Sequence, residues 1–306
     1  MRPTRAGLAA ALLLAATAVA PGTAPAAPPS RPSLRMGVVA EEPNEPDRLL
    51  RVYGDMLARL RERLAPAGFG VDQLVVARDV EDLAQRIERG EVDVVIETVF
   101  PTLMLQARSR TLVPTLAVVR RGQRSYRSVF FTRAESPIRA LADLRGRTLV
   151  LQALRSTSAF ALPVAELRAA GIAVRPADES VLGRADVRYL LALAEINQAV
   201  WVLHGRGDAG AFSDSDWAAL PVRIRSGLRV FHESRPLLRG VLSFRSELDP
   251  GLRRAAEQVL LGLAGDPAGR AALTAASGIT AIAPLTEDEV REVRSLAAVL
   301  RPGPAR

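Results

Sequence analysis

The chain has 306 residues, and its 41 basic residues, all of them arginine, outnumber 33 acidic ones to give a formal net charge of +8. The absence of cysteine and lysine excludes disulfide scaffolds, thiolate metal sites, Walker-type phosphate loops and Schiff-base lysines. With 48% hydrophobic and 4% aromatic residues, the chain can bury the cores of two lobes but lacks the stacking surface of a nucleic-acid binder.

Residues 1–26 have the pattern of a signal peptide. Two arginines precede an uncharged apolar run from Gly7 to Ala20, which is too short to span a bilayer comfortably. Ala24-Pro25-Ala26 fits the small-x-small pattern of cleavage sites, so we expect a mature chain that begins near Ala27. An uncleaved anchor is the alternative. No other uncharged stretch approaches about 20 residues, which predicts an exported, periplasmic protein without a membrane span.

Apolar strands alternate with helical patterns in the first part of the mature chain. Residues 48–64 carry apolar side chains at helical spacing, and residues 92–96 form a nearly continuous apolar strand. This alternation predicts a mostly parallel sheet with helices on both faces. The predicted elements are strands at 34–39, 71–76, 92–96, 112–119 and 126–131, and helices at 48–64 and 80–87.

A second α/β unit begins after a polar turn at residues 120–124. No internal repeat and no low-complexity linker interrupts the pattern after the leader. The predicted elements here are helices at 136–144, 156–170, 190–203, 252–264, 268–276 and 288–300, and strands at 147–151, 172–174, 208–212, 228–231 and 240–244.

Three hydroxyl side chains, Ser156, Thr157 and Ser158, stand where a predicted strand passes through a short loop into a helix. A helix start exposes backbone N–H groups and the positive end of the helix dipole. Together with the hydroxyl groups, it could bind phosphate, phosphonate, sulfonate or carboxylate without a lysine. The alternative is plain N-capping by one of the hydroxyl groups, which needs no ligand.

Several segments resemble, in order, the phosphonate- and phosphite-type periplasmic solute-binding proteins of ABC importers. The most specific is STSAFALP from Ser156, within a frame of YRSVFFTRAESPI from Tyr126, LADLRGRTLVL from Leu141 and AAGI from Ala169. Weaker matches precede and follow this frame, so that the resemblance covers nearly the whole mature chain. They are LRMGVV, GEVDVVIE, LVPTLAVVRRGQRSY, GRGDAGAF, LRVFHESRPLLRGVLSFRSEL and GDPAGRAALTAASGI.

The resemblance implies an α/β protein with a two-lobe periplasmic-binding-protein fold of type II. Two mixed, mostly parallel sheets would be joined by two hinge strands, near 125–126 and 236–239. Residues 27–125 and 239–306 would then form the first lobe, and residues 126–238 the second. The ligand would lie between the lobes, beyond the C-terminal ends of the strands, and its binding would close the hinge.

The candidate ligand-binding residues come from the family's pattern and from strand ends. Ser156, Thr157 and Ser158 match the family's oxyanion-binding residues. The other candidates are Glu97 and Thr98 after the third strand, Tyr126 beside the first crossing, Glu195 at the start of a predicted helix, and Asp208 in a Gly-x-x-Asp-Ala strand.

Simpler roles remain open for several of these candidates. Glu97 could hold a ligand's amino group or be an exposed loop acid, Tyr126 could line the cleft or only pack at the hinge, and Asp208 could be a strand-end acid. Many family members carry a tyrosine after the third strand, where this chain has Phe100, and a histidine in place of Glu195. Acids at Glu97 and Glu195 would repel a dianion, which leaves a zwitterion such as an aminoalkyl phosphonate as an alternative to a phosphonate, phosphite or phosphate-like ligand.

These features predict a solute-binding protein and not an enzyme, with a hydrolase as the less favoured alternative. His204 and His232 are the only imidazole groups, and the chain has no Gly-x-Ser-x-Gly elbow. No metal or organic cofactor is implied. The expected partner is an ABC permease, and a membrane histidine kinase that recognises the ligand-bound form is the alternative. The basic residues are dispersed among acids, so the net charge does not indicate a nucleic-acid partner.

Overall fold

The computed structural model describes residues 31–40, 45–179 and 183–300, which belong to one compact unit. The predicted signal peptide at 1–26 lies outside these residues. Among the helices that the structure describes, none combines the length and the apolar character needed to cross a membrane.

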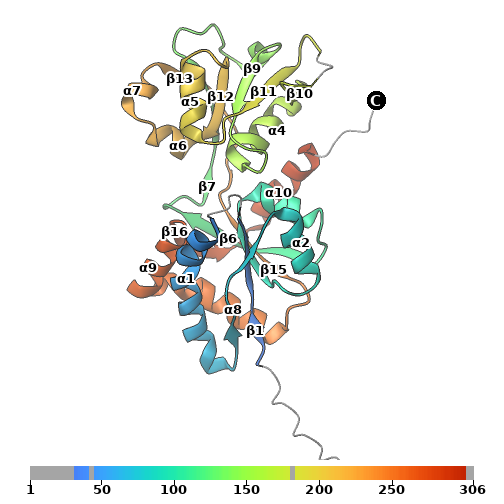
Figure 1. The fold of residues 1–306 in the computed structure, drawn as a ribbon, viewed down its shortest axis with the longest axis vertical. Coiled ribbons are helices and arrows are strands. Elements are labelled where there is room, and N and C mark those ends of the chain that lie inside the picture. Colours follow the sequence, from blue (N-terminus) through green and yellow to red (C-terminus); the bar gives the residue numbers. More distant parts are fainter. Residues whose placement is uncertain (1–30, 41–44, 180–182, 301–306) are drawn as a thin grey trace, which may run out of the picture. The chain divides into compact units, whose positions relative to one another are not determined.

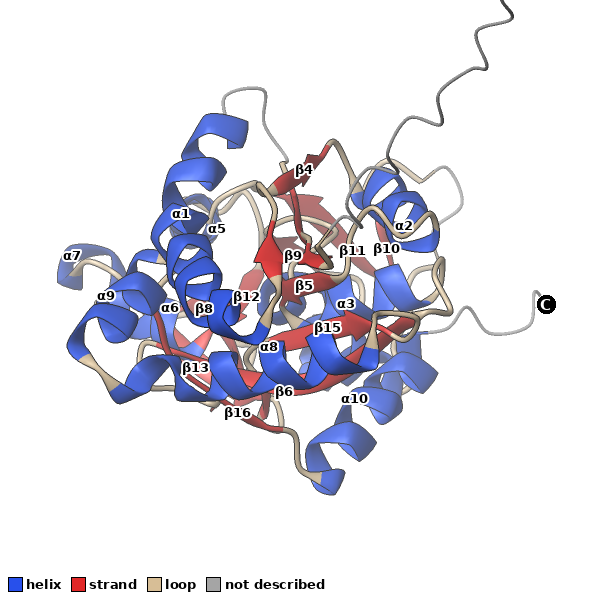
Figure 2. Ribbon diagram, turned by 90° about the horizontal axis from the view of Figure 1, so that it is seen from below, coloured by secondary structure: helices blue, strands red, loops and turns tan. Residues whose placement is uncertain are grey.

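The first of two six-stranded sheets has the strand order β16-β6-β15-β5-β2-β4. β2 is parallel to β4 and β5, whereas β15 and β16 run antiparallel to their neighbours. Figure 2 shows β6, β15 and β16 side by side, as their pairing requires. The strands are β2 (Met36–Val39), β4 (Val75–Ala77), β5 (Val94–Glu97), β6 (Leu112–Arg120), β15 (Val241–Arg245) and β16 (Ile279–Pro284).

Alternate residues of a central strand supply two cores on opposite faces of this sheet. Val94 and Ile96 of β5 pack in a cluster with residues of α1 and α8, while Val95 between them packs with residues of α2. This is the pattern of a strand covered by helices on both faces. The helices around the sheet are α1 (Glu45–Leu64), α2 (Val80–Glu88), α3 (Val99–Gln106), α8 (Pro250–Gly262), α9 (Pro267–Ala275) and α10 (Glu287–Leu300).

The second sheet has the strand order β10-β11-β9-β12-β8-β13 and is built in the same way. Phe130 of β8 packs with Val164 of α4, and the next residue, Phe131, packs with Val202 of α5 on the other face. Figure 1 shows α5 beside β12. The elements are β8 (Ser128–Arg133), β9 (Thr148–Leu151), β10 (Val174–Pro176), β11 (Val187–Leu191), β12 (Ala209–Ser213), β13 (Leu228–Glu233), α4 (Leu162–Ala169), α5 (Glu195–Leu203), α6 (Asp214–Ala219) and α7 (Val222–Arg225).

Two short strands connect the sheets along the chain. β7 (Ser125–Tyr126) lies between β6 of the first sheet and β8 of the second, and β14 (Leu237–Leu238) lies between β13 and β15. The two pair antiparallel, with Tyr126 opposite Leu237. The segments predicted as crossings therefore form one two-stranded ribbon. A separate pair is made by β1 (Ser33–Leu34) and β3 (Gly70–Val71).

Four predicted elements differ from the structure. The predicted strand at 172–174 is displaced to β10 at Val174–Pro176, because the backbone N–H of Ile172 still closes the end of α4 by donating to the carbonyl of Leu167 at 2.9 Å. The predicted helix at 190–203 is wrong in its first turn, because β11 continues to Leu191 and the left-handed backbone of Leu193 (φ 64°) separates it from α5. The predicted strand at 71–76 is divided between β3 and β4. The predicted helix at 136–144 is reduced to a 3-10 turn at Leu141–Leu144. The Asp143 carboxylate accepts hydrogen bonds from the backbone N–H groups of Arg139 and Ala140, which precede this turn.

A buried carboxylate ties the entries of two strands together. The side chain of Asp93 is 0% exposed and pairs with Arg35 (Nε to Oδ2, 2.7 Å) and with Arg245 (Nη2 to Oδ1, 3.0 Å). The backbone N–H of Arg35 donates to the same carboxylate at 3.1 Å. The network joins the residues just before β2 and β5 to the last residue of β15, at one end of the first sheet.

Candidate functional site

A cavity of about 670 Å³ lies where strands of both sheets end. Its lining includes the last residues of four strands: Val39 of β2, Glu97 of β5, Arg120 of β6 and Ser213 of β12. Seven of the eight predicted site residues line it: Glu97, Thr98, Tyr126, Ser156, Thr157, Ser158 and Glu195. This is the position in which open α/β sheets bind ligands.

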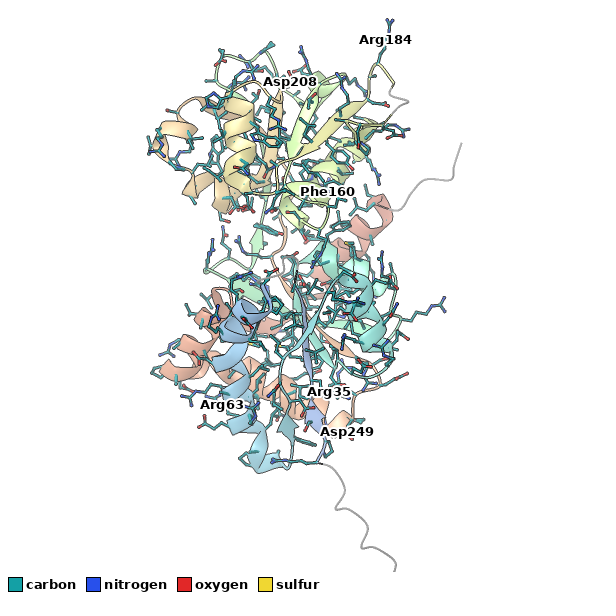
Figure 3. The ribbon with its side chains drawn as sticks, viewed as in Figure 1. Arg35, Arg63, Phe160, Arg184, Asp208 and Asp249 are labelled. Atoms are coloured by element: carbon teal, nitrogen blue, oxygen red, sulfur yellow. The ribbon has the colours of Figure 1, made fainter. Side chains whose placement is uncertain are left out.

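Asp208 is the predicted site residue that the structure does not bring to this cavity. It stands just before β12, which runs parallel to β9, so it lies at the opposite end of these strands from Ser213 (Figure 3). Its carboxylate accepts a hydrogen bond from the backbone N–H of Thr148 at 2.8 Å and lies 3.7 Å from Nη1 of Arg147. Asp208 stands before its strand, whereas the cavity residues lie at or after the ends of theirs. The direction of the strand therefore places Asp208 at the other end of the sheet.

The three hydroxyl residues open a π-helical turn, Thr157–Ala161, that continues into α4. The backbone N–H of Ala161 donates to the carbonyl of Ser156 at 2.9 Å, five residues back. Ser156 Oγ caps the turn by accepting from the N–H of Ala159 at 3.1 Å. In accepting this bond, the hydroxyl keeps its own hydrogen for an anion. Single π-helical turns of this kind occur frequently at functional sites.

Thr157 plays a second role that the sequence did not predict. Its hydroxyl is buried, donates to Thr98 Oγ1 at 2.8 Å and accepts from the backbone N–H of Phe100 at 2.9 Å. Phe100 is the second residue of α3, whose own N-cap, Thr98, makes no side-chain cap bond. Thr157 therefore supplies the cap of a helix that packs on the other sheet.

Glu97 is neither an exposed loop acid nor an isolated negative charge. Its side chain is 19% exposed, and its Oε1 lies 3.5 Å from Nη2 of Arg155, whose side chain is 22% exposed. The guanidinium offsets part of the repulsion that this carboxylate would exert on an anion.

Tyr126 lines the cavity and also packs in the crossing ribbon. Its side chain is 5% exposed, and burial raises the pKa of its hydroxyl to about 12. The guanidinium of Arg239 lies 5.0 Å from the centre of the tyrosine ring. Tyr126 therefore presents a neutral hydroxyl to the cavity at any physiological pH.

Burial raises the pKa of Glu195 above its ordinary value, and the charge of Asp216 raises it further. The residue stands at the start of α5, and both carboxyl groups line the cavity. A raised pKa means that this carboxyl is protonated more readily than an exposed glutamate, which reduces its repulsion of an anion.

Glu195→Gln is expected to raise the melting temperature above about pH 7 and to leave it unchanged near pH 4. Because the folded-state pKa exceeds the unfolded value of about 4.5, the folded protein binds this proton more tightly. The associated stability is complete below the unfolded pKa and is lost as the pH rises through the folded pKa, whereas glutamine is neutral throughout. Melting curves across this pH range test the prediction, with exposed Glu292→Gln as control. Melting temperatures that follow the wild type at every pH would contradict it.

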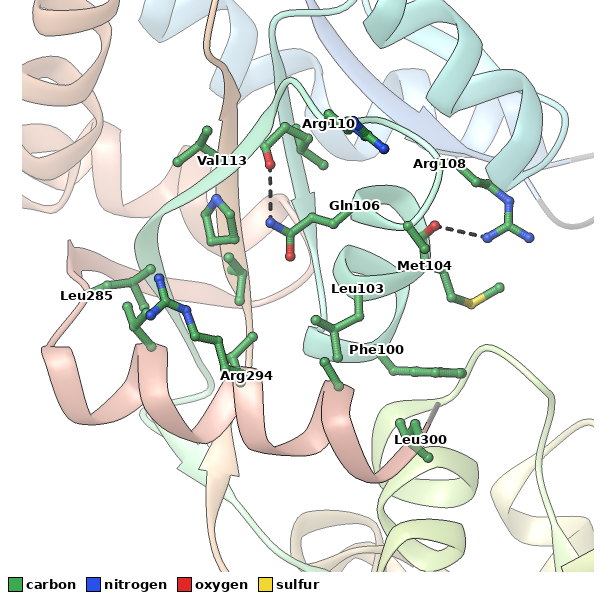
Figure 4. Close-up of a pocket in the computed structure, with 17 residues that line it drawn as sticks. Phe100, Leu103, Met104, Gln106, Arg108, Arg110, Val113, Leu285, Arg294 and Leu300 are labelled. Atoms are coloured by element: carbon green, nitrogen blue, oxygen red, sulfur yellow. Dashed lines mark hydrogen bonds between the residues drawn. The ribbon is translucent and has the colours of Figure 1, made fainter. Parts of the chain in front are cut away.

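A second cavity, of about 700 Å³, contains none of the predicted site residues. Its lining comes mainly from α3, β6 and α10 and is largely apolar; Figure 4 shows Phe100, Leu103 and Leu300 facing it. The amide of Gln106 donates to the carbonyl of Leu112 at 3.2 Å, so that this polar group is already bonded within the protein. Arg108, Arg110 and Arg294 also line this cavity, but none of the predicted site residues does. We place the functional site in the first cavity, where the hydroxyl-bearing turn meets the ends of strands from both sheets.

A cavity at the strand ends of two sheets, which are connected by a pair of crossing strands, defines a two-lobe binding protein with the type II periplasmic fold. The chain belongs to the family of periplasmic substrate-binding proteins of phosphonate ABC transporters. The family's model, described as "ABC transporter, phosphonate, periplasmic substrate-binding protein", matches residues 38–290. This is a family of transport proteins, and the predicted resemblance and fold class are confirmed.

Solved structures agree with this assignment. XAC2383 from Xanthomonas citri, determined with chloride ion and with ATP, is 30% identical, with a TM-score of 0.78 over 87% of this chain and 96% of its own. PhnD1 from Prochlorococcus marinus, in complex with methylphosphonate, is 14% identical, with a TM-score of 0.63 over 88% and 98%. The aliphatic sulphonate binding protein SsuA from Escherichia coli is 18% identical, with a TM-score of 0.52 over 88% and 92%. The last two similarities show the fold alone.

Proposed function

We propose that the protein captures a small phosphorus oxyanion in the 670 Å³ cavity and delivers it to an ABC permease. The observation that carries this proposal is the convergence of the hydroxyl-bearing turn with the ends of strands from both sheets. Ser156 donates from its hydroxyl, and the backbone N–H groups at the start of the turn add the positive end of a helix dipole. The protein acts by binding and not by catalysis; among the described residues, neither histidine lines the cavity.

Electrostatics favour an oxyanion over a zwitterion. The carboxylate expected to hold a ligand's amino group, Glu97, is already paired with Arg155. The raised pKa of Glu195 weakens the second negative charge, and further arginines line the same cavity. ATP, the ligand named for the similar structure of XAC2383, carries phosphorus oxyanions, which supports the same class here.

The crossing ribbon is the hinge of this proposed mechanism. We assign residues 27–125 and 239–306 to the first lobe and residues 126–238 to the second, with β7 and β14 as the strands that flex. The protein is exported by a signal peptide at 1–26 that is cleaved near Ala26. The permease then recognises the closed, ligand-bound form.

Thermal shifts of the exported chain test the ligand class. The panel comprises phosphate, methylphosphonate, 2-aminoethylphosphonate, a sulfonate, amino acids and ATP. A ligand at 100 times its dissociation constant adds about 2.7 kcal/mol to stability, which a melting curve resolves easily. We expect shifts with phosphorus oxyanions and none with amino acids. Shifts confined to amines or amino acids would contradict the proposal and would favour a site built on Glu97 and Glu195.

A further inference from the structure

Three arginines that the sequence analysis did not single out line the same cavity. Arg120 ends β6, Arg121 follows it at the tip of a turn, and Arg239 follows β14 in the second crossing segment. We call these three residues the arginine cluster.

Arg120 and Arg239 are half-buried and Arg121 is exposed, and the side-chain hydrogen bonds of Arg120 and Arg239 go to neutral partners. Arg120 donates from Nη1 to the carbonyl of Ser277 at 3.1 Å, and its buried Nε has no hydrogen-bond partner. Arg239 donates from Nη1 to Gln123 Oε1 at 2.5 Å and to Ser215 Oγ at 3.0 Å. Within the described part of the chain, no carboxylate forms an ion pair with any of the three. By contrast, Asp93 neutralises Arg35 and Arg245.

These positive charges lie close enough to affect one another. Burial lowers the pKa of Arg239 from its ordinary value. Tyr126, Asp216 and Asp214 oppose this effect, and the charge of Arg121 adds to it. Glu97, Glu195 and Asp216 line the same cavity, but none of them forms an ion pair with the arginine cluster, whose guanidinium groups therefore add positive potential at the cavity wall. Planar guanidinium groups match the oxygens of phosphate in particular.

The turn that carries Arg121 is strained. Reciprocal backbone hydrogen bonds between residues 120 and 123 (3.0 and 2.9 Å) close a two-residue turn whose central residues, Arg121 and Gly122, both have positive φ (51° and 76°). Turns of this kind prefer asparagine, aspartate or glycine at the first central position. The backbone N–H of Arg121 is held by the carbonyl of Gly278 at 2.8 Å. An arginine kept in a conformation that it disfavours, beside a cavity, indicates a functional use.

We propose that the ligand is a polyphosphate chain, of the class of tripolyphosphate and nucleoside triphosphates. One phosphoryl group occupies the hydroxyl-bearing turn at Ser156, and the further phosphoryl groups bind the arginine cluster. The inference rests on the proposed function, which concerns the first of these two subsites. A volume of about 670 Å³ falls within the range of sites for drug-sized ligands and leaves room beyond one phosphoryl group.

Isothermal titration without divalent metal tests the proposal with phosphate, methylphosphonate, AMP, tripolyphosphate and ATP. We expect tripolyphosphate or ATP to bind at least tenfold more tightly than phosphate or AMP. The double variant Arg120→Gln/Arg121→Asn should bind triphosphates at least tenfold more weakly than the wild type, and methylphosphonate less than threefold more weakly. Equal losses of affinity for tripolyphosphate and ATP would show that only the phosphate chain of the ligand is recognised. A larger loss for one of the two would identify that ligand's class, inorganic polyphosphate or nucleotide, as the source.

Two controls separate the effect of the arginine cluster on binding from a general loss of positive charge and from a loss of stability. Arg184→Gln/Arg223→Gln removes the same charge from exposed positions and should leave every affinity unchanged. Arg121→Asn alone should weaken triphosphate binding at an equal or higher melting temperature, because asparagine accepts the left-handed conformation.

The outcomes distinguish the two proposals. Equal affinity for mono- and triphosphates, or a double variant that retains triphosphate affinity, would overturn the polyphosphate inference and leave the proposed function standing if methylphosphonate binds. Failure of every phosphorus compound to bind would overturn both.

Discussion

Asp93→Asn is expected to lower the free energy of unfolding by about 3–5 kcal/mol, the range for removing one partner of a buried ion pair. The change leaves Arg245, whose side chain is 11% exposed, without its buried counter-charge. It also weakens the tie to Arg35 and to its backbone N–H. Because both arginines remain charged at all accessible pH values, they cannot relieve the loss by deprotonating. Urea unfolding measured by circular dichroism gives the difference directly.

The matched control is Asp55→Asn, which makes the same chemical change at an exposed position of α1 and should shift stability by less than about 0.5 kcal/mol. The Asp93 variant should retain ligand affinity when folded, since the ion network does not line the cavity. A loss below about 1 kcal/mol would mean that water or the backbone replaces the carboxylate and that the network contributes little.

Replacing Ser156 and Thr157 together by alanine is expected to weaken binding of a phosphorus oxyanion by about 1–3 kcal/mol, the scale of removing hydrogen-bond donors from a buried charged group. The same variant should also lose stability, by about 0.5–2 kcal/mol, because Thr157 caps α3. Single variants separate the two effects. Ser156→Ala removes the donor to the ligand together with the cap on the Ala159 N–H, but it leaves the cap of α3 in place. Thr157→Ser restores the hydroxyl at position 157 and should recover both the affinity and the stability.

Titration of methylphosphonate into each variant, alongside its melting curve, measures both effects. Thr274→Ala removes an exposed hydroxyl from α9 and should change neither the affinity nor the site. An unchanged affinity in the Ser156/Thr157 double variant would exclude the turn as the oxyanion site, whatever its stability.

Local patterns predicted most of the sheet strands, because buried parallel strands are short apolar runs flanked by helical periodicity. They failed where a distant contact decides the structure. α3 was not predicted, since its sequence has Pro101 in the first turn and a cap supplied by Thr157, 57 residues from Phe100. The boundary of α5 was misplaced because one left-handed residue, Leu193, divides an apolar run that has no Gly or Pro to mark the break.

The site was predictable to the extent that it follows strand ends. Glu97 and Ser156 each follow a strand that points to the cavity, so the rule for open α/β sheets brings them together. The arginine cluster was missed because Arg239 lies more than 100 residues from the adjacent Arg120 and Arg121, and the pairing of β7 with β14 brings it to them. In the sequence, Arg120 and Arg239 look like any other of the chain's arginines.

The hydroxyl of Thr157 has one hydrogen, and in this structure that hydrogen is committed to Thr98. An oxyanion that recruits Thr157 must therefore take the hydrogen from a contact that holds the two halves of the molecule together. The apparent affinity is then reduced by the free energy needed to break that contact. Thr98→Val removes the competing acceptor, so it should tighten ligand binding and lower the stability of the unliganded protein. One side chain would thus set the concentration of solute at which the protein begins to respond.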